Sequence, residues 1–350
     1  MKKVIVAEGL GRTFLRRVRA PGLWGSFKAL FGSRFEEIHA VQGLSFSANA
    51  GEMVGLIGEN GAGKSTTVKM LTGILVPTAG RVRVLGLEPA KNRGKLSLRM
   101  GVVFGQRPQL LWDIPVRETF ELLRTMYAIP GSIYRWTYGE AVRRLDLEPL
   151  LRVPVRQLSL GQRMRCDLAA SLLHAPAVAF LDEPTIGLDA IAKEEVREYI
   201  RLIQRQFGTT IVLTTHDLKD ITELCSRLVV LHQGELMYDG SLSGFERKYA
   251  PERRIIATLE DRMTAAKSRV LASTIRRSGG ELRTWEPYRL VIEYREKGVA
   301  TRIMRGLLRT ANPSDFVMER ADIETIVRRL YRKPASASPE IPGGIGGHPR

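Results

Sequence analysis

Gly58-Glu59-Asn60-Gly61-Ala62-Gly63-Lys64-Ser65-Thr66 is the most informative segment of this 350-residue chain. It fits the pattern G-x-x-x-x-G-K-[ST] of a phosphate-binding loop. The apolar run at 53–57 predicts a buried strand before the loop, and residues 66–75 predict a helix after it. Glycines allow the backbone N–H groups to surround an anion, and the helix N-terminus adds partial positive charge. The segment therefore predicts a strand–loop–helix unit that binds the phosphates of a nucleotide.

All nine residues of this loop are expected to contact the nucleotide, and two of them have distinct roles. Lys64 can reach the β- and γ-phosphates, whereas the Ser65 hydroxyl can be a ligand of Mg²⁺. A glycine-rich turn that matches by chance is the alternative. The strand before the loop and the helix after it favour a phosphate-binding loop that works with Mg²⁺.

The composition restricts the class of protein. The chain has 44% hydrophobic residues, which is enough for a large core, and no apolar stretch approaches the roughly 18 residues of a membrane span. Its N-terminus lacks the apolar core of a signal peptide, and two cysteines suit a reducing cytosol. The net charge of +17 indicates an anionic partner, either nucleic acid or the anionic inner face of a membrane.

A second apolar run, at 177–183, predicts a buried strand that ends in Asp182 and Glu183. In a nucleotide-binding fold Asp182 would hold the Mg²⁺ shell, through water. Glu183 would orient or deprotonate the water that attacks the γ-phosphate.

The segment between these two sites resembles the LSGGQ signature of ABC-type ATPases. It reads Leu158-Ser159-Leu160-Gly161-Gln162-Arg163. Further motifs of that family follow its order: Gln106 at the Q-loop position, 183–189 at the junction of Walker B and D-loop, and His216 at the switch position. The resemblance covers residues 1–240.

The resemblance implies roles for individual residues. Glu183, His216 and Gln106 would be catalytic, and Ser65, Gln106 and Asp182 would surround the metal. Ser159, Gly161, Gln162 and Asp189 would complete the nucleotide site of a second chain. Leu160 departs from the glycine that is usual in the signature.

Several of these residues also have a plain structural interpretation. Gln106 could be a surface amide, His216 a satisfied buried imidazole, and Asp189 the cap of the helix that follows it. Phe14 is expected to stack on adenine, with Phe35 as the second choice, although either could be a core residue.

Alternating strand and helix patterns predict an α/β fold, a P-loop NTPase core with a largely parallel sheet flanked by helices. The nucleotide-binding domain is expected at 1–245, with a helical subdomain at 107–165 that resembles the surface contacting a membrane partner. Residues 12–34 read as an insertion with six basic residues, no acidic residue and an apolar stripe at helical spacing. That stripe suits either an interfacial segment near lipid or packing on its own domain.

A second domain is expected at 251–333. Its pattern is strand (255–259), helix (262–277), strand (281–285), strand (289–295), helix (299–311), strand (316–318) and a last helix at 323–332. The first six elements have the order of the ferredoxin-like α+β arrangement. The tail at 334–350 is rich in Pro, Ser, Ala and Gly and is expected to be disordered.

The resemblance implies two copies of the chain that sandwich two ATP molecules head to tail. Hydrolysis would drive a permease encoded on a separate chain. The motifs at 104–107, 111–113 and 185–190 are similar to bacterial exporters of drugs, polysaccharides or lipids. The expected location is the cytoplasmic face of the inner membrane. The alternative is a soluble ABC ATPase acting on nucleic acid or the ribosome, which the single phosphate loop and the lack of a coiled-coil run disfavour.

Overall fold

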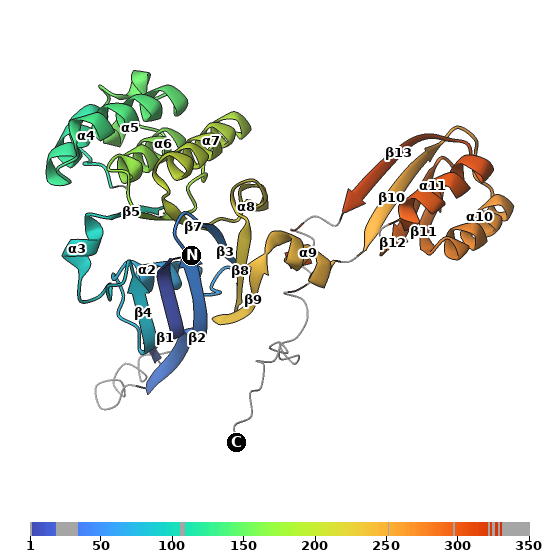
Figure 1. Ribbon diagram of the computed structural model, residues 1–350, viewed down its shortest axis with the longest axis horizontal. Helices are drawn as coiled ribbons and strands as arrows, with labels where there is room; N and C mark the ends of the chain where they lie inside the picture. The colour runs from blue at the N-terminus through green and yellow to red at the C-terminus, as the bar shows by residue number, and fades with distance from the viewer. Residues whose placement is uncertain are drawn as a thin grey trace, which may run out of the picture. The chain divides into compact units, whose positions relative to one another are not determined.

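The computed structural model describes residues 2–18, 34–105, 109–250, 252–296 and 298–320, together with Ile323, Ile326, Val327 and Leu330. The chain divides into two compact units, Met1–Leu242 and Ser243–Arg350. This division lies a few residues before the predicted end of the first domain. The two units are described separately (Figure 1).

The first unit is built on a six-stranded sheet of order β5-β6-β7-β3-β8-β9. These strands are β3 (Met53–Gly58), β5 (Met100–Phe104), β6 (Val178–Asp182), β7 (Thr210–Thr214), β8 (Arg227–His232) and β9 (Glu235–Ser241). All neighbours are parallel except β8 and β9. The central strands are continuous apolar runs because helices cover both faces of a parallel sheet. The predicted α/β core is confirmed.

Helices connect these strands: α2 (Lys64–Leu71), α3 (Arg93–Ser97), α7 (Ala190–Phe207) and α8 (Leu218–Leu224). The predicted bounds 66–75 of the first helix were wrong. Helix α2 begins at Lys64, and it ends at Leu71 because Gly73 takes a left-handed conformation with φ of 76°. Helix α7 buries Val196, Tyr199 and Ile200 on one face.

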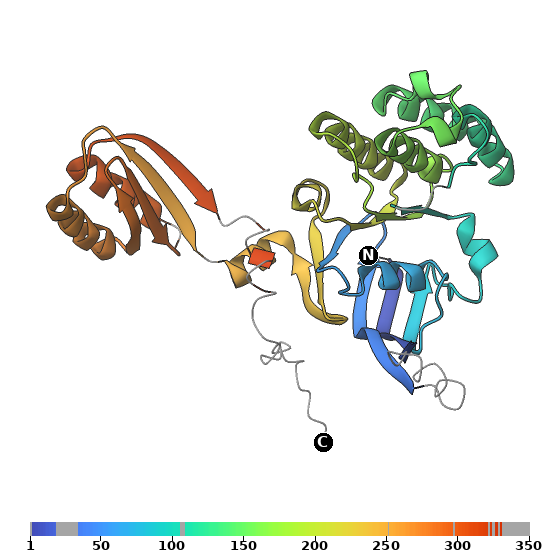
Figure 2. The same ribbon diagram turned by 180° about the vertical axis from the view of Figure 1, so that it is seen from behind.

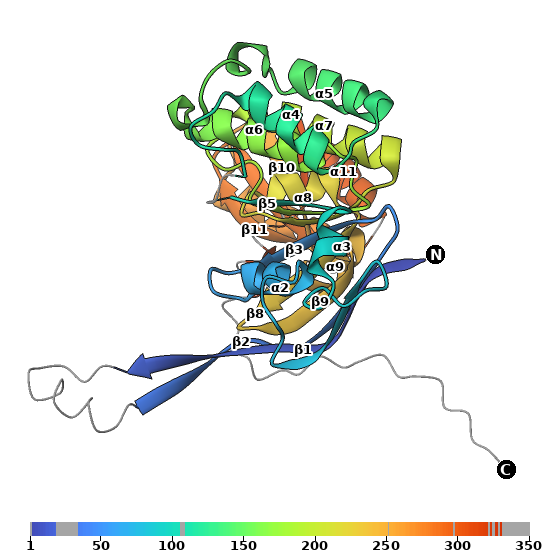
Figure 3. The ribbon, with the colours of Figure 1, turned by 90° about the vertical axis from the view of Figure 1, so that its left-hand side faces the viewer.

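A separate three-stranded antiparallel sheet of order β2-β1-β4 covers α2. It consists of β1 (Lys3–Val18), β2 (Arg34–Asn49) and β4 (Ala79–Val84). Beyond Gly11, the last residue that pairs with β4, strands β1 and β2 continue as a two-stranded ribbon (Figure 3).

The structure differs from the predicted insertion at 12–34, because residues at both ends of that range belong to β-strands. Residues 12–18 continue β1 and pair with β2 as far as Val18 and Arg34. Strand-forming residues lie opposite each other across this ribbon, as Phe14 does to Ile38, which favours an extended conformation. The apolar stripe predicted at helical spacing lies outside the described residues.

Three helices form the helical part of the first unit: α4 (Val116–Met126), α5 (Gly131–Arg144) and α6 (Leu160–Leu172). Two short 3₁₀ turns, Glu148–Leu150 and Val155–Gln157, precede α6. Phe120 and Ala141 are fully buried among these helices. The described part of the predicted helical subdomain at 107–165 is thus mostly helical, and its last helix continues to Leu172, beyond the predicted end.

The second unit begins within α9 (Leu242–Tyr249). It contains β10 (Arg253–Leu259), α10 (Ala265–Arg277), β11 (Gly280–Glu286), β12 (Arg289–Tyr294), α11 (Val299–Thr310) and β13 (Pro313–Arg320). The sheet order is β11-β12-β10-β13, with all pairs antiparallel. This is the predicted ferredoxin-like arrangement, and α10 and α11 lie on one face of the sheet (Figure 2).

The core of the second unit lies between its sheet and its two helices. Leu271, Ile275 and Ile303 pack from the helices onto Ile255 and Ile292 of the sheet. The four residues described beyond 320 are helical and buried at a spacing of three and four residues. The other residues of the helix predicted at 323–332 lie outside the described residues.

Candidate nucleotide-binding site

The shape of the phosphate loop depends on glycine at two positions. Gly63 has φ of 96°, and a Cβ there would collide with the carbonyl oxygen of Ala40 in β2. A Cβ on Gly58 would approach the carbonyl oxygen of Leu231 in β8 to 2.6 Å. The same carbonyl of Ala40 also lies 3.0 Å from the position that a Cβ on Gly234 would take. The loop is thus held against the backbone of two neighbouring strands.

Lys64 is the first residue of α2 and only 8% exposed. Its Nζ donates hydrogen bonds to the carbonyl oxygens of Gly58 at 2.7 Å and Glu59 at 3.0 Å. Burial lowers the pKa of this ammonium, while the negative charges of Glu183, Asp182 and Glu59 oppose that shift. A cation at this place is suited to an anionic ligand.

The loop opens into a cavity of ≈ 510 Å³. The described residues that line it come from the loop, from α2 and the turn after it, from the ends of β5 and β6 and the turn after β6, and from the segment after β7. They are Asn60, Gly61, Gly63, Lys64, Ser65, Thr66, Lys69, Ile74, Phe104, Gly105, Asp182, Glu183, Ile186 and His216. The parallel topology explains this meeting, because the carboxyl ends of β3, β5, β6 and β7 lie at the same edge of the sheet.

Glu183 and His216 face each other in this cavity. Their side chains are 3.2 Å apart, from Nε2 of His216 to Oε1 of Glu183. The backbone N–H of His216 donates to Oε2 of the same carboxylate at 3.2 Å. The backbone N–H of Glu183 donates to Thr214 at 2.9 Å, and the Thr214 hydroxyl donates to the carboxylate of Asp182. Two adjacent strands therefore hold both acids and the histidine in one place.

The environment of Glu183 suits a general base. Burial raises the pKa of its carboxyl, while the charge and N–H of His216 oppose the shift. A carboxylate with a raised pKa accepts a proton more readily from water. Glu183 also has φ of 57°, an uncommon conformation for a residue with a side chain, of a kind that concentrates at functional sites.

The signature residues lie at the N-terminus of α6. The Ser159 hydroxyl accepts from the backbone N–H of Gln162 at 3.3 Å, and the Gln162 side chain accepts from the N–H of Ser159 at 3.0 Å. This is a capping box. None of Ser159, Gly161 and Gln162 is among the described residues of the cavity. One copy of the chain therefore does not bring its signature to its own phosphate loop.

Leu160, the departure from the signature pattern, lies against Gly187. A Cβ on Gly187 would come within 2.8 Å of the Leu160 side chain, and a Cβ on Gly161 would come within 2.8 Å of the Gly187 carbonyl oxygen. The leucine is 44% exposed. The signature turn and the turn after Glu183 are thus packed together within one chain.

The structure places the remaining predicted residues as follows. Asp189 caps α7 by accepting from the backbone N–H of Ala192 at 2.9 Å, as its structural interpretation required. Gln106 lies outside the described residues. Phe14 is half-buried on the ribbon, with the guanidinium of Arg12 4.7 Å from its ring centre. Phe35 is 60% exposed at the far part of the ribbon. Adenine stacking by Phe14 stays a prediction.

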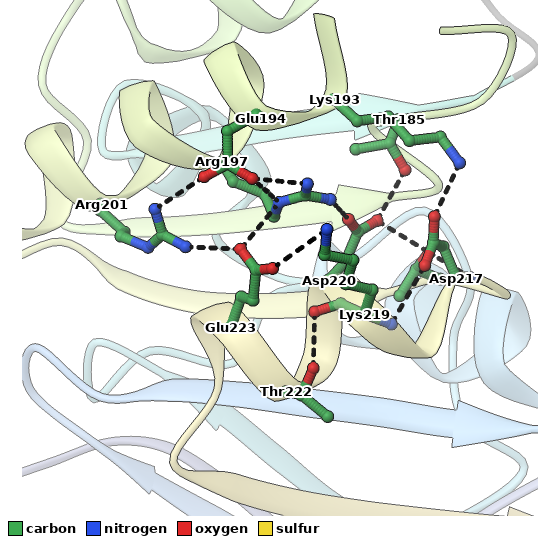
Figure 4. A network of polar contacts seen from close by, with 11 residues as sticks. Thr185, Lys193, Glu194, Arg197, Arg201, Asp217, Lys219, Asp220, Thr222 and Glu223 are labelled. Atoms are coloured by element: carbon green, nitrogen blue, oxygen red, sulfur yellow. Dashed lines mark hydrogen bonds and ion pairs between the residues drawn. The ribbon is translucent and has the colours of Figure 1, made fainter. Parts of the chain in front are cut away.

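Sequence reasoning missed a buried polar network between α7 and α8 (Figure 4). Arg197 of α7 and Asp220 of α8 form an ion pair at 2.8 Å, with side chains 2% and 0% exposed. Thr185 and Thr215 both donate to the same carboxylate. The two charged residues are 23 positions apart, and neither stands in a recognised motif. The buried stripe of α7 gives no sign that Arg197 belongs to the core.

A phosphate loop between a strand and a helix, with two acids at the end of another parallel strand of the same sheet, defines a P-loop nucleotide-binding ATPase. The family model described as ABC transporter matches residues 41–186. NatA of Bacillus subtilis, an ABC transporter ATP-binding protein, is 30% identical over 223 residues, which are 64% of this chain and 89% of NatA. The chain belongs to the ABC transporter family, as an ATP-binding, ATP-hydrolysing subunit.

Two further proteins are similar to it. The Nod factor export ATP-binding protein I of Ralstonia nicotianae is 36% identical over 207 residues, 59% of this chain and 64% of that protein. The chain thus spans slightly less than two thirds of that relative. The dimeric structure of MJ0796, a bacterial ABC transporter cassette, superposes with a TM-score of 0.55 and 26% identity over 68% of this chain and 98% of that one. These matches favour the transporter function over the soluble alternative.

Proposed function

We propose that this chain binds ATP with Mg²⁺, dimerises around two nucleotides, and drives the export of a compound through a separate membrane permease. The observation that carries this proposal is the single cavity shared by Lys64, Ser65, Asp182, Glu183 and His216. It combines a buried cation, oxygen donors and a carboxylate with a raised pKa, which are the groups that phosphoryl transfer to water requires.

The residues of the cavity fit a magnesium ion. Ser65 and Asp182 offer a hydroxyl and a carboxylate, and Mg²⁺ prefers oxygen ligands that include phosphates of the substrate. Bound there, the ion would neutralise charge on the phosphates. The described residues contain no group of three or more His, Cys, Asp or Glu arranged to hold a metal by itself, which suits an ion that arrives with ATP.

The chain's own residues have separate tasks in hydrolysis. Lys64 and the N–H groups of the loop hold the phosphates. Glu183 accepts a proton from the attacking water, and its raised pKa favours that transfer. His216 keeps the carboxylate in place through its ring and its backbone N–H. Gln106 is proposed to reach the metal and the water, in line with its motif.

A second copy of the chain is the proposed source of the signature contacts. Ser159, Gly161 and Gln162 are absent from the described lining of their own chain's cavity. They stand at the N-terminus of α6, where backbone N–H groups favour an anion. A partner's signature would therefore close the outer side of the γ-phosphate, with Asp189 nearby.

A separate permease and a membrane location complete the proposal. In the described part of the chain, no helix has the length and apolar character needed to cross a bilayer. The name of the Ralstonia relative includes export, and the motifs at 104–107, 111–113 and 185–190 resemble exporters. Leu111 and Trp112 are 46% and 48% exposed on the helical part, where the resemblance expects the permease contact. The +17 charge suits the anionic inner face of the membrane.

Mixing two inactive variants tests the catalytic and the dimer assignments together. Glu183→Gln should bind ATP but hydrolyse it about 10²-fold more slowly, because the base is lost. Ser159→Arg should also be inactive, because it blocks the signature. A mixed dimer restores one complete site, from the phosphate loop of the Ser159→Arg chain and the signature of the Glu183→Gln chain.

The expected result is ATPase activity in the mixture that neither variant shows alone. Chains that carry both substitutions serve as the control, since mixing them with Glu183→Gln cannot create a complete site. Failure of the mixture to recover activity, with both variants folded and able to bind ATP, would contradict the shared site. Co-purification with a permease, followed by substrate uptake into inverted vesicles, tests the export direction.

A further inference from the structure

The carboxylate of Asp220 joins the two loops that hold the proposed catalytic pair (Figure 4). The Thr185 hydroxyl donates to its Oδ2 at 2.6 Å, and the Thr215 hydroxyl donates to the same oxygen at 3.2 Å. Thr185 stands two residues after Glu183, and Thr215 immediately precedes His216. One buried oxygen therefore accepts from both sides of the Glu183–His216 pair.

Arg197 fixes the orientation of this carboxylate. Its Nη1 donates to Oδ1 of Asp220 at 2.8 Å, which leaves Oδ2 for the two threonines. Arg197 is itself held by Glu194 at 2.7 Å and by Glu223 at 3.1 Å. Because these contacts hold the guanidinium in place, rotation of the Asp220 carboxylate would break its bonds to Arg197, Thr185 and Thr215 at once.

Other contacts also connect the two segments: the backbone N–H of Glu183 donates to the Thr214 carbonyl at 2.9 Å, and the His216 side chain contacts Glu183 nearer to solvent. The His216 ring is 57% exposed, and its contact with Glu183 is 3.2 Å long. The Asp220 and Arg197 side chains are at most 2% exposed, so their hydrogen bonds form in a medium of low dielectric. Helix α7 starts directly after Asp189 and α8 starts after Asp217, so the pair also links the helices that follow the two loops.

We propose that Asp220, held by Arg197, is a positioning residue for ATP hydrolysis, which sets the distance between Glu183 and His216 through Thr185 and Thr215. The inference rests on the proposed roles of Glu183 and His216. Asp220 contacts no reacting atom. Its effect on the reaction passes through the backbone of the two loops.

Hydroxyl removal at Thr185 is the direct test, in the full-length chain. Thr185→Val keeps the shape of the side chain and removes the donor to Asp220. We expect kcat for ATP to fall on the order of tenfold, since small misplacement of catalytic groups costs rate, with KM for ATP within about twofold of the parent. Thr185→Ser retains the hydroxyl and should restore kcat to within about twofold.

Two controls separate positioning from a loss of fold. Thr222→Val makes the same change on α8, where the hydroxyl bonds the carbonyl of Lys219 at 2.9 Å and does not contact Asp220; its kcat should not change. Adding Thr185→Val to Glu183→Gln should produce no further loss, because the base through which Thr185 acts is already gone. Thermal midpoints of all variants are measured beside the rates.

Three results would overturn the inference: an unchanged kcat in Thr185→Val, an equal loss in Thr185→Ser, or losses that multiply with Glu183→Gln. These results can be distinguished from a failure of the proposed function itself. Hydrolysis near the parental rate in Glu183→Gln alone would remove the assigned base, whatever Thr185→Val does.

Discussion

Replacing Arg197 with methionine should destabilise the first unit strongly. Methionine keeps much of the apolar stem of the arginine but removes the charge. Asp220 then stays fully buried with two hydroxyl donors and no cation. Breaking a buried ion pair by removing one partner typically costs about 3–5 kcal/mol, because the remaining charge has no compensation.

The surroundings of Arg197 indicate that the loss of stability in Arg197→Met lies near the low end of that range. Glu223 keeps its ion pair with Arg201 at 2.8 Å, and Glu194 is 44% exposed and can be hydrated. Only the buried carboxylate, among the three acids that contact Arg197, loses its compensation. A loss of about 3 kcal/mol corresponds to a fall in Tm of roughly 6–12 °C for a unit of this size.

The measurement is thermal unfolding by calorimetry, with Lys91→Met as the matched control. Lys91 pairs with Glu88 at 2.9 Å, but its side chain is 73% exposed. An exposed pair contributes about 0–1 kcal/mol, so this variant should hardly move Tm. If Arg197→Met lowers Tm no more than Lys91→Met does, the buried pair contributes nothing and the reasoning fails.

A double variant tests the cause of the loss. Arg197→Met with Asp220→Leu removes both charges and fills the space with apolar atoms. Such replacements of buried pairs are often neutral, so we expect stability to return to within about 1 kcal/mol of the parent. Hydrolysis should stay low, because Thr185 and Thr215 have lost their acceptor. A double variant no more stable than Arg197→Met would show that the unpaired carboxylate was not the cause.

Four further outcomes are expected. Lys64→Ala should weaken ATP binding, measured by calorimetric titration; an unchanged Kd would contradict the phosphate-loop assignment. Gly63→Ala should abolish ATP binding because its Cβ would meet the Ala40 carbonyl, whereas Gly139→Ala, where a Cβ meets nothing within 4 Å, should not. Burial raises the pKa of Glu183 above its usual 4.5, and the base must be deprotonated, so single-turnover hydrolysis should already fall at a pH above 4.5; full rates down to pH 4.5 would refute this. Burial lowers the pKa of His174 from 6.5 to about 4, so its contribution to stability is complete above pH 6.5 and is lost as the pH falls towards 4. In His174→Gln the loss of unfolding free energy between pH 7 and 5 should therefore be smaller by about 2 kcal/mol, measured by urea unfolding.

Short-range patterns in the sequence predicted most of the fold. The apolar runs before Lys64 and up to Asp182 became parallel strands of one sheet, with β7 between them, as continuous apolar runs of that length indicate. The ferredoxin-like order of the second unit followed from alternating periods of two and 3.6 residues. The ribbon was harder to predict, because Arg16 and Arg17 interrupt the apolar alternation of a strand whose pairing partner lies some twenty residues away.

The site was predicted as a set of residues but not as a geometry. The motifs named Glu183 and His216, although nothing in the sequence gives their 3.2 Å contact. The Arg197–Asp220 pair could not be predicted, because a buried charge is identified by its partners in space and not by its neighbours in the chain. Ile74, Phe104 and Ile186 line the cavity for the same reason: the topology of the sheet brings distant segments to one edge.

The Ala40 carbonyl has a consequence for engineering. It abuts both Gly63 and Gly234, so the nucleotide loop takes part of its outline from a strand that contains none of the nine loop residues. Transplanting those nine residues into a foreign scaffold would transfer their functional groups but not the β2 backbone at Ala40 against which the loop packs. A successful graft would need the matching segment of β2 as well.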